Sequence, residues 1–186
     1  ILRGILIFFL SLILLIVICL AAYNGIKHIR FKGYYDIATK MRDNPGLNDG
    51  YVTQGLCYLE DEDVYLTSGY MTDKEKPSRV YSVDKNNKQH FAELYYLKDG
   101  VEKNFSYHCG GVASEGDYVY VAGASKIFSF LKKDILNSNK AVAVKSFAVN
   151  NAASFVFTDG NFLYTGEFND DNAYKTENEF KNTDGE

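Results

Sequence analysis

The sequence predicts an all-β soluble domain preceded by one N-terminal transmembrane α-helix. Three observations lead to this prediction. Residues 5–22 form an uncharged apolar run, and the rest of the chain carries most of the 15 tyrosines and 13 phenylalanines. Between residues 53 and 169, a hairpin-like motif occurs three times. Tyrosine and phenylalanine favour the half-buried, pleated surface of strands, so the aromatic bias agrees with a β domain.

The apolar run from Ile5 to Ala22 is long enough for a membrane helix. At about 1.5 Å per residue it approaches the hydrocarbon thickness of about 30 Å, and it has no polar face. Tyr23 lies where an interfacial aromatic residue belongs. Basic residues follow at the level of the lipid head groups: Lys27, Arg30 and Lys32. We therefore expect residues 1–26 to form a transmembrane helix that contacts membrane lipid through residues 5–23.

A cleaved secretory signal is the alternative to a retained signal anchor. The apolar part of a secretory signal usually has about 7–15 residues and ends at a small-x-small cleavage site. The present run is longer, and Leu20-Ala21-Ala22 is only a partial match to such a site. Ile18 before Cys19 also departs from a lipoprotein signal. The sequence therefore favours an uncleaved anchor.

The orientation of the anchor follows from two opposing arguments. The basic residues after the helix would place the next domain in the cytoplasm by the positive-inside rule. However, the chain begins with Ile rather than Met, so the charges before the helix are not counted, and long folded domains translocate largely regardless of local charge. An N-terminal hydrophobic signal followed by a β domain is typical of an exported protein. We expect a single-pass protein of the cell membrane whose soluble domain lies outside the cytoplasm.

Residues 27–49 are polar and are expected to form a juxtamembrane linker. A helical turn is expected at Tyr35–Arg42, and Asn44-Pro45-Gly46 would then break it. At the other end, residues 169–186 are expected to form a polar loop or a truncated tail.

Residues 50–168 contain the repeat. Its units are TQGLCYLEDEDVYLTSGY at 53–70, HCGGVASEGDYVYVAGAS at 108–125 and AASFVFTDGNFLYTGEFN at 152–169. Aligned without gaps, Gly55 and Gly110 coincide with Ser154, and a tyrosine recurs at positions 65, 120 and 164. Each unit joins two short strands through an acidic or glycine-containing turn, which is typical of a β-hairpin.

Further strands are predicted after the first two hairpins. Arg79–Asp84 and Lys126–Phe130 are candidate third strands, and His90–Leu97 and Ala141–Val149 are candidate fourth strands. The units start 55 and 44 residues apart. Four short strands per unit at such a period are typical of β-propeller blades. We expect a partial β-propeller of about three blades, because closed propellers have about four to eight. The chain is thus expected to be a fragment, and a β-sandwich of similar hairpins is the alternative fold.

The first unit resembles a known family. Thr53–Leu56, Val64–Tyr70 and Ser78–Val80 are similar to the first blade of propeller-type glutamine cyclotransferases, which cyclise N-terminal glutamine to pyroglutamate. In that family the strand before the small-residue turn carries a catalytic glutamate, and the matching position here is Leu66. The resemblance therefore implies the fold without that activity.

The later units resemble a broader set of exported bacterial propellers of unknown function. The similar segments are His108–Val112, Lys126–Phe128, Ala153–Phe155 and Gly166–Phe168.

Candidate binding residues follow from the position of the first strand in each unit. In a propeller this strand is innermost and lines the central channel, where ligands commonly bind. Gln54, His108 and Ser154 lie at or next to equivalent positions and are expected to converge there, and Glu167 adds a carboxylate. The alternative is that these polar groups bond to neighbouring backbone in a hydrated channel. Gly55, Gly110 and Gly111 would let the inner strands approach closely.

No catalytic residue, metal site or cofactor is predicted. His108 and Cys109 are adjacent, so in a strand they point to opposite faces and do not form a nucleophile–base pair. The chain has no Cys-x-x-Cys spacing, and the acidic run Glu60–Asp63 lacks the spaced ligands of a calcium loop. Cys57 and Cys109 are expected to be buried apolar groups, with a disulfide as the alternative. The net charge of −4 does not favour nucleic-acid binding.

Together these observations predict a membrane-anchored extracytoplasmic β-propeller that binds an unknown small molecule or protein. The alternative is an exported propeller enzyme of the hydrolase, lactonase or cyclase-like kind, with catalytic groups partly outside this chain.

Overall fold

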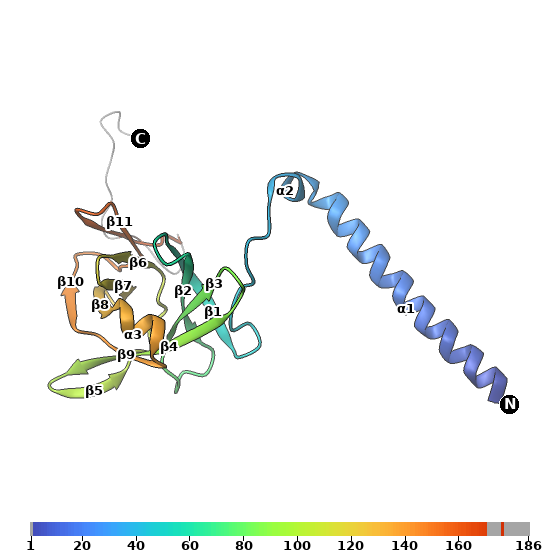
Figure 1. The fold of residues 1–186 in the computed structure, drawn as a ribbon, viewed down its shortest axis with the longest axis horizontal. Helices are drawn as coiled ribbons and strands as arrows, with labels where there is room; N and C mark the ends of the chain where they lie inside the picture. The colour runs from blue at the N-terminus through green and yellow to red at the C-terminus, as the bar shows by residue number, and fades with distance from the viewer. Residues whose placement is uncertain (1, 171–175, 177–186) are drawn as a thin grey trace. The chain divides into compact units, whose positions relative to one another are not determined.

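A computed structural model describes residues 2–170 and residue 176 (Figure 1). The described chain divides into two compact units, one that ends at Met41 and one that begins at Arg42. We call them the helical unit and the β unit, and each is described by itself.

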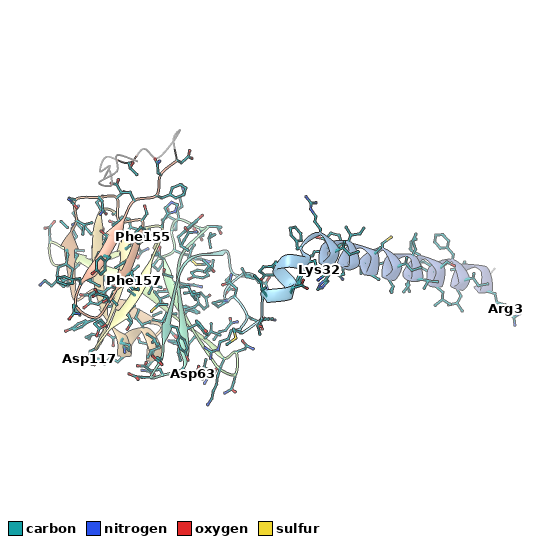
Figure 2. The ribbon with its side chains drawn as sticks, turned by 90° about the horizontal axis from the view of Figure 1, so that it is seen from above. Arg3, Lys32, Asp63, Asp117, Phe155 and Phe157 are labelled. Atoms are coloured by element: carbon teal, nitrogen blue, oxygen red, sulfur yellow. The ribbon has the colours of Figure 1, made fainter. Side chains whose placement is uncertain are left out.

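The helical unit contains α1 (Leu2–Arg30) and α2 (Lys32–Ile37). The most apolar window of α1 has a mean hydropathy of 3.4, and none of that window is buried. Side chains project from all sides of the helix between Arg3 and Lys32 (Figure 2). By length and composition α1 is able to cross a membrane. A signal sequence near an N-terminus has the same length and composition.

Both helices differ in their bounds from the expectation. α1 continues beyond residue 26, and its last turn carries basic side chains that suit the negative end of the helix dipole. A helical turn was expected at Tyr35–Arg42, whereas α2 spans Lys32–Ile37 and so begins and ends earlier in the chain.

The β unit is mostly β-structure and contains three sheets (Figure 1). The first sheet has the order β1-β2-β3-β4-β5, with β9 paired to β4; the second has the order β10-β8-β7-β6; the third is the hairpin β11-β12. The strands of the first sheet are β1 (Tyr51–Leu59), β2 (Val64–Met71), β3 (Arg79–Asp84), β4 (Gln89–Lys98), β5 (Val101–Asn104) and β9 (Lys140–Val142). The remaining elements are β6 (Val112–Glu115), β7 (Tyr118–Gly123), β8 (Lys126–Leu131), α3 (Lys132–Asn137), β10 (Lys145–Ala148), β11 (Phe155–Thr158) and β12 (Leu163–Gly166).

The three predicted hairpins are β1-β2, β6-β7 and β11-β12, all antiparallel. Each turn contains a residue with positive φ: Asp63 at 50°, Gly116 at 55° and Gly160 at 90°. Glycine reaches this region without strain, and aspartate tolerates it better than most residues. The turn chemistry read from the sequence therefore agrees with the turns of the structure.

The predicted fourth strand Ala141–Val149 is divided between two sheets. Its first part is β9, which pairs in parallel with β4, and its second part is β10, which pairs with β8. Ala141 is buried in the core, which holds β9 against the first sheet. The prediction that this whole segment belongs to the second unit was wrong.

Two hydrophobic clusters join the sheets. The larger lies between the first and second sheets and includes Leu66, Leu94, Phe105 and Phe130, with Ile135 of α3. The smaller joins the second and third sheets and consists of Ala113, Ala122, Ile127, Ala153 and Val156.

The first strands of the three sheets adjoin in chain order, β1 beside β6 and β6 beside β11. Glycines lie at these approaches. A Cβ atom at Gly55 would lie 2.9 Å from Gly111 Cα, one at Gly110 would collide with Ser154 O, and one at Gly111 would collide with Val156 N. The expected role of these three glycines in close strand approach is confirmed.

The segment before β1 belongs to the β unit, so the unit begins ahead of the expected boundary at residue 50. Arg42 Nη2 contacts Asp63 Oδ1 at 2.7 Å, and its guanidinium lies 4.5 Å from the centre of the Tyr65 ring. Hydrogen bonds from Arg42 and then from Tyr58 lower the pKa of Asp63. Pro45 is fully buried.

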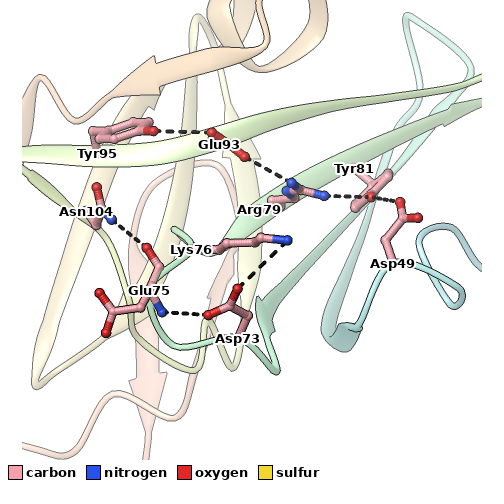
Figure 3. A network of polar contacts seen from close by, with 9 residues as sticks. All are labelled: Asp49, Asp73, Glu75, Lys76, Arg79, Tyr81, Glu93, Tyr95 and Asn104. Atoms are coloured by element: carbon pink, nitrogen blue, oxygen red, sulfur yellow. Dashed lines mark hydrogen bonds and ion pairs between the residues drawn. The ribbon is translucent and has the colours of Figure 1, made fainter.

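A polar network connects β3 and β4 to neighbouring loops (Figure 3). Arg79 Nη2 donates to Glu93 Oε1 at 2.9 Å, and its guanidinium lies 4.1 Å from the centre of the Phe91 ring. Tyr81 donates to Asp49 Oδ2, and Tyr95 donates to Glu93 Oε2. The contacts of Arg79 and Tyr81 link β3 to β4 and to the segment before β1, so the network holds the β3–β4 register.

Candidate functional site

A cavity of about 860 Å³ lies in the β unit. Its lining comes from β1, from the segment before β6, from the end of β7 and from the residues before β11 and after β12. All four candidate residues line it: Gln54, His108, Ser154 and Glu167. The structure thus brings together residues that are far apart in the chain.

Hydrogen bonds from the first sheet hold the segment that carries His108. Ser68 Oγ donates to Cys109 O at 2.8 Å, and Ser78 Oγ donates to Tyr107 O at 2.6 Å. The backbone N–H of Ser78 donates to Phe105 O at 2.7 Å. Ser68 and Ser78 are buried, so these bonds satisfy groups that would otherwise lack partners away from water.

His108 and Cys109 point in different directions. Cys109 has a φ of 54° and is fully buried in the core, whereas His108 is exposed and its ring centre lies 4.7 Å from that of Tyr70. Burial raises the pKa of the Cys109 thiol to about 12. A buried thiol that keeps its proton at neutral pH is not an activated nucleophile, so Cys109 packs rather than reacts.

Backbone irregularities recur at equivalent positions of the three units. The β1–β2 register shifts at Gln54, while Cys109 and Ala153 have left-handed φ values of 54° and 45°. Each of these residues directly precedes the aligned position Gly55, Gly110 or Ser154. The second and third units therefore share a left-handed residue at this position, whereas the first unit has an irregular strand register there.

The third sheet supplies Ser154 and Glu167 to the cavity. The N–H of Ser154 donates to Gly166 O at 2.8 Å, and Glu167 Oε1 accepts from the N–H of Ala152 at 3.2 Å. Asn151 Oδ1 accepts from the N–H of Ala153 at 2.8 Å. These contacts fix the residues on both sides of the hairpin, so the carboxylate and the hydroxyl are held beside the same cavity.

The lining combines hydrogen-bonding groups with apolar surface. An amide, an imidazole, hydroxyls and a carboxylate lie beside alanines and Phe168. Such a lining suits a small ligand that has both polar and apolar parts. Among the described residues, no group of three or more His, Cys, Asp or Glu is placed to hold a metal ion.

Ten of the fourteen lining residues were not among the predicted site residues, and Ser106 and Phe168 are two of them. Ser106 lies in a stretch without a strand pattern, so no periodicity marks it. Leu66, in contrast, is fully buried in the larger hydrophobic cluster and does not line the cavity.

The three cysteines are free thiols, so Cys57 and Cys109 are not bridged. Cys109 is buried as expected, and Cys57 is half-buried. Comparison of the sequence with protein-family models and with curated proteins finds no match for this chain.

Proposed function

We propose that the β unit has the architecture of a β-propeller, that α1 anchors it outside the cytoplasm, and that its cavity binds a small ligand with polar and apolar parts. In this proposal each sheet is a blade, and the first strand of each blade is innermost. The adjoining first strands, the glycines between them and the repeated backbone irregularities support this arrangement.

The observation that carries the binding function is the convergence of four polar side chains from three sequence units on one cavity. Concave sites with a few convergent polar groups are where proteins usually bind small molecules. His108 is the central group, since its ring packs on Tyr70 and its backbone segment is fixed by two buried serines. The ligand is therefore expected to make its main polar contact with His108.

Binding is tested with a fragment library of small amides, sugars and organic acids on the full chain in detergent micelles. Ligand-observed NMR is expected to find fragments whose signals change on binding. Their affinity is expected to fall about tenfold in His108→Ala, because a hydrogen bond of about 1.4 kcal/mol corresponds to that factor.

His90→Ala is the matched control, because His90 lies at the β3–β4 pairing and does not line the cavity. Fragment binding that His108→Ala and Gln54→Ala leave unchanged would contradict the proposed site.

The orientation is tested by adding protease to intact cells that carry the protein with a C-terminal epitope. The epitope is expected to be lost without permeabilisation, because the β unit would face the outside. An epitope that is cleaved only after the membrane is opened would place the β unit in the cytoplasm and reject this part of the proposal.

A further inference from the structure

The helical unit has a short basic segment directly after a long uncharged stretch. The first charged side chains on the two sides of that stretch are Arg3 and Lys27, so 23 residues without a charge lie between them. At about 1.5 Å per residue this stretch spans about 34 Å, slightly more than the hydrocarbon thickness of about 30 Å. When α1 crosses a membrane, its last turn and the residues that follow therefore lie at the level of the head groups.

α2 is held close to the end of α1. The first helix ends at Arg30, and Phe31 leaves the helical backbone with a φ of −111° and a ψ of 28°. The N–H of Phe31 donates to Lys27 O at 3.0 Å, and the N–H of Tyr35 donates to Phe31 O at 3.1 Å. The ring centres of His28 and Tyr35 lie 4.0 Å apart. These contacts fix α2 beside the last turn of α1, so both lie at the same depth.

The two faces of α2 differ in polarity. Lys32 and Asp36 are four residues apart, so they share one face, and their side chains form an ion pair. Tyr34 and Ile37 are three residues apart and share the other face, where they are 64% and 85% exposed. Phe31, directly before α2, is also exposed. An exposed apolar face opposite a charged one is typical of a helix that lies in the membrane interface.

The charge of this segment is complementary to a negatively charged lipid surface. Between residues 24 and 41 the sequence has four lysines or arginines and one acidic residue, Asp36, whose carboxylate is paired with Lys32. Lys27 and Arg30 lie in the last turn of α1. Long basic side chains lay their apolar stems along apolar surface and keep the charged group in the polar layer. Both side chains are therefore able to reach lipid phosphates from the end of the apolar helix.

We infer that α2 and the last turn of α1 bind negatively charged phospholipid in the leaflet where α1 ends. Phe31, Tyr34 and Ile37 enter the boundary between head groups and acyl chains. Lys27 and Arg30 contact the phosphates and give the segment its preference for anionic lipid. The inference rests on the proposed anchoring by α1 and is independent of the ligand cavity.

The depth of α2 is tested with tryptophan fluorescence, since the chain has no tryptophan of its own. The full chain with Tyr34→Trp is reconstituted into vesicles of phosphatidylcholine and phosphatidylglycerol that carry bromine near the head-group end of the acyl chains. Strong quenching and emission at short wavelength are expected. Asp36→Trp is the matched control on the charged face of α2, and weaker quenching is expected there. Equally weak quenching in both variants would place α2 in water and overturn the inference.

The preference for negative charge is tested by comparing brominated phosphatidylglycerol with brominated phosphatidylcholine as quenchers of Tyr34→Trp. Stronger quenching by the anionic lipid is expected. Its enrichment around α2 is expected to fall about fivefold in Lys27→Gln and again in Arg30→Gln, the usual contribution of one basic residue near an anionic surface. Lys88→Gln is the matched control, because Lys88 is an exposed lysine of the β unit. Equal quenching by the two lipids would overturn the inference.

A tryptophan within α1 separates this inference from the proposed anchor. Leu14 lies near the middle of the uncharged stretch, so Leu14→Trp is expected to be quenched by bromine near the ends of the acyl chains. Quenching of Leu14→Trp without quenching of Tyr34→Trp would mean that α1 crosses the membrane and that the inference about α2 is wrong. If neither is quenched, the anchor and the inference fail together. Fragment binding at the cavity is measured separately and is expected to be unchanged in Lys27→Gln.

Discussion

Replacing Phe105 with alanine is expected to lower the free energy of unfolding of the β unit by about 4 kcal/mol, as for other fully buried phenylalanines. The ring is fully buried, with its centre 4.8 Å from those of Tyr107 and Phe128 in edge-on contacts. Its removal deletes these contacts and leaves a cavity in the larger cluster. Urea unfolding of the full chain, followed by near-UV circular dichroism, measures the loss.

Phe162→Ala is the matched control, since Phe162 is 67% exposed in the β11–β12 turn. Its effect is expected to stay within about 0.5 kcal/mol, as is usual for surface positions. Equal losses in the two variants would mean that Phe105 is not part of a packed core. Because the Phe105 ring also packs against the ring of Tyr107, which directly precedes His108, the Phe105→Ala variant is further expected to loosen the segment that carries His108.

Hairpins were predictable because their determinants are local. The turn residues Gly116 and Gly160 and the alternating strands on either side determine both the turn and the pairing partner within about fifteen residues. The third strand of the first sheet was predicted with the bounds that β3 has, because Arg79–Asp84 is rich in β-branched and aromatic residues and lies between Pro77 and Lys85. Local patterns do not determine how sheets associate, and the propeller arrangement therefore stays a proposal.

Two kinds of strand were missed. β5 forms a local hairpin with β4 through Asp99-Gly100, but it is exposed at every residue, so no apolar alternation marks it. Strands that depend on distant contacts were missed as well. β9 joins the first sheet through a parallel pairing with β4, and the two strands are more than forty residues apart in sequence. The early start of the β unit has the same cause, since the partner of Arg42 is Asp63 on the far side of β1.

The candidate site was predicted from equivalence within the repeat rather than from a motif. Gln54, His108 and Ser154 were chosen because they lie at or next to equivalent positions of the three units. In the structure these three residues line one cavity. The left-handed backbone at Cys109 and Ala153 was not predicted, since both residue types usually have negative φ. The sequence thus indicated which residues lie at the same cavity, whereas the orientation of each side chain could be determined only from the structure.

Gly111→Ala is expected to lower the free energy of unfolding of the β unit by about 3 kcal/mol, at the upper end of the usual range for overpacking. A Cβ atom at this position would collide with Val156 N and would lie 2.8 Å from Phe155 Cα. These are backbone atoms of β11, so no side-chain rotation relieves the collision. The third sheet would have to move away from the second, and with it Ser154 and Glu167 at the cavity. Urea unfolding measures the stability.

Gly116→Ala separates this collision from backbone strain. Gly116 has a φ of 55° and open space around its Cα, so alanine there is expected to cost only about 1–2 kcal/mol for a left-handed backbone. Fragment binding to the cavity is expected to weaken in Gly111→Ala and to stay unchanged in Gly116→Ala, because only Gly111 contacts the strand that supports Ser154. If Gly111→Ala is as stable as the natural chain, β6 and β11 do not approach as closely as the inner strands of a propeller must, and the proposed architecture fails together with the cavity that depends on it.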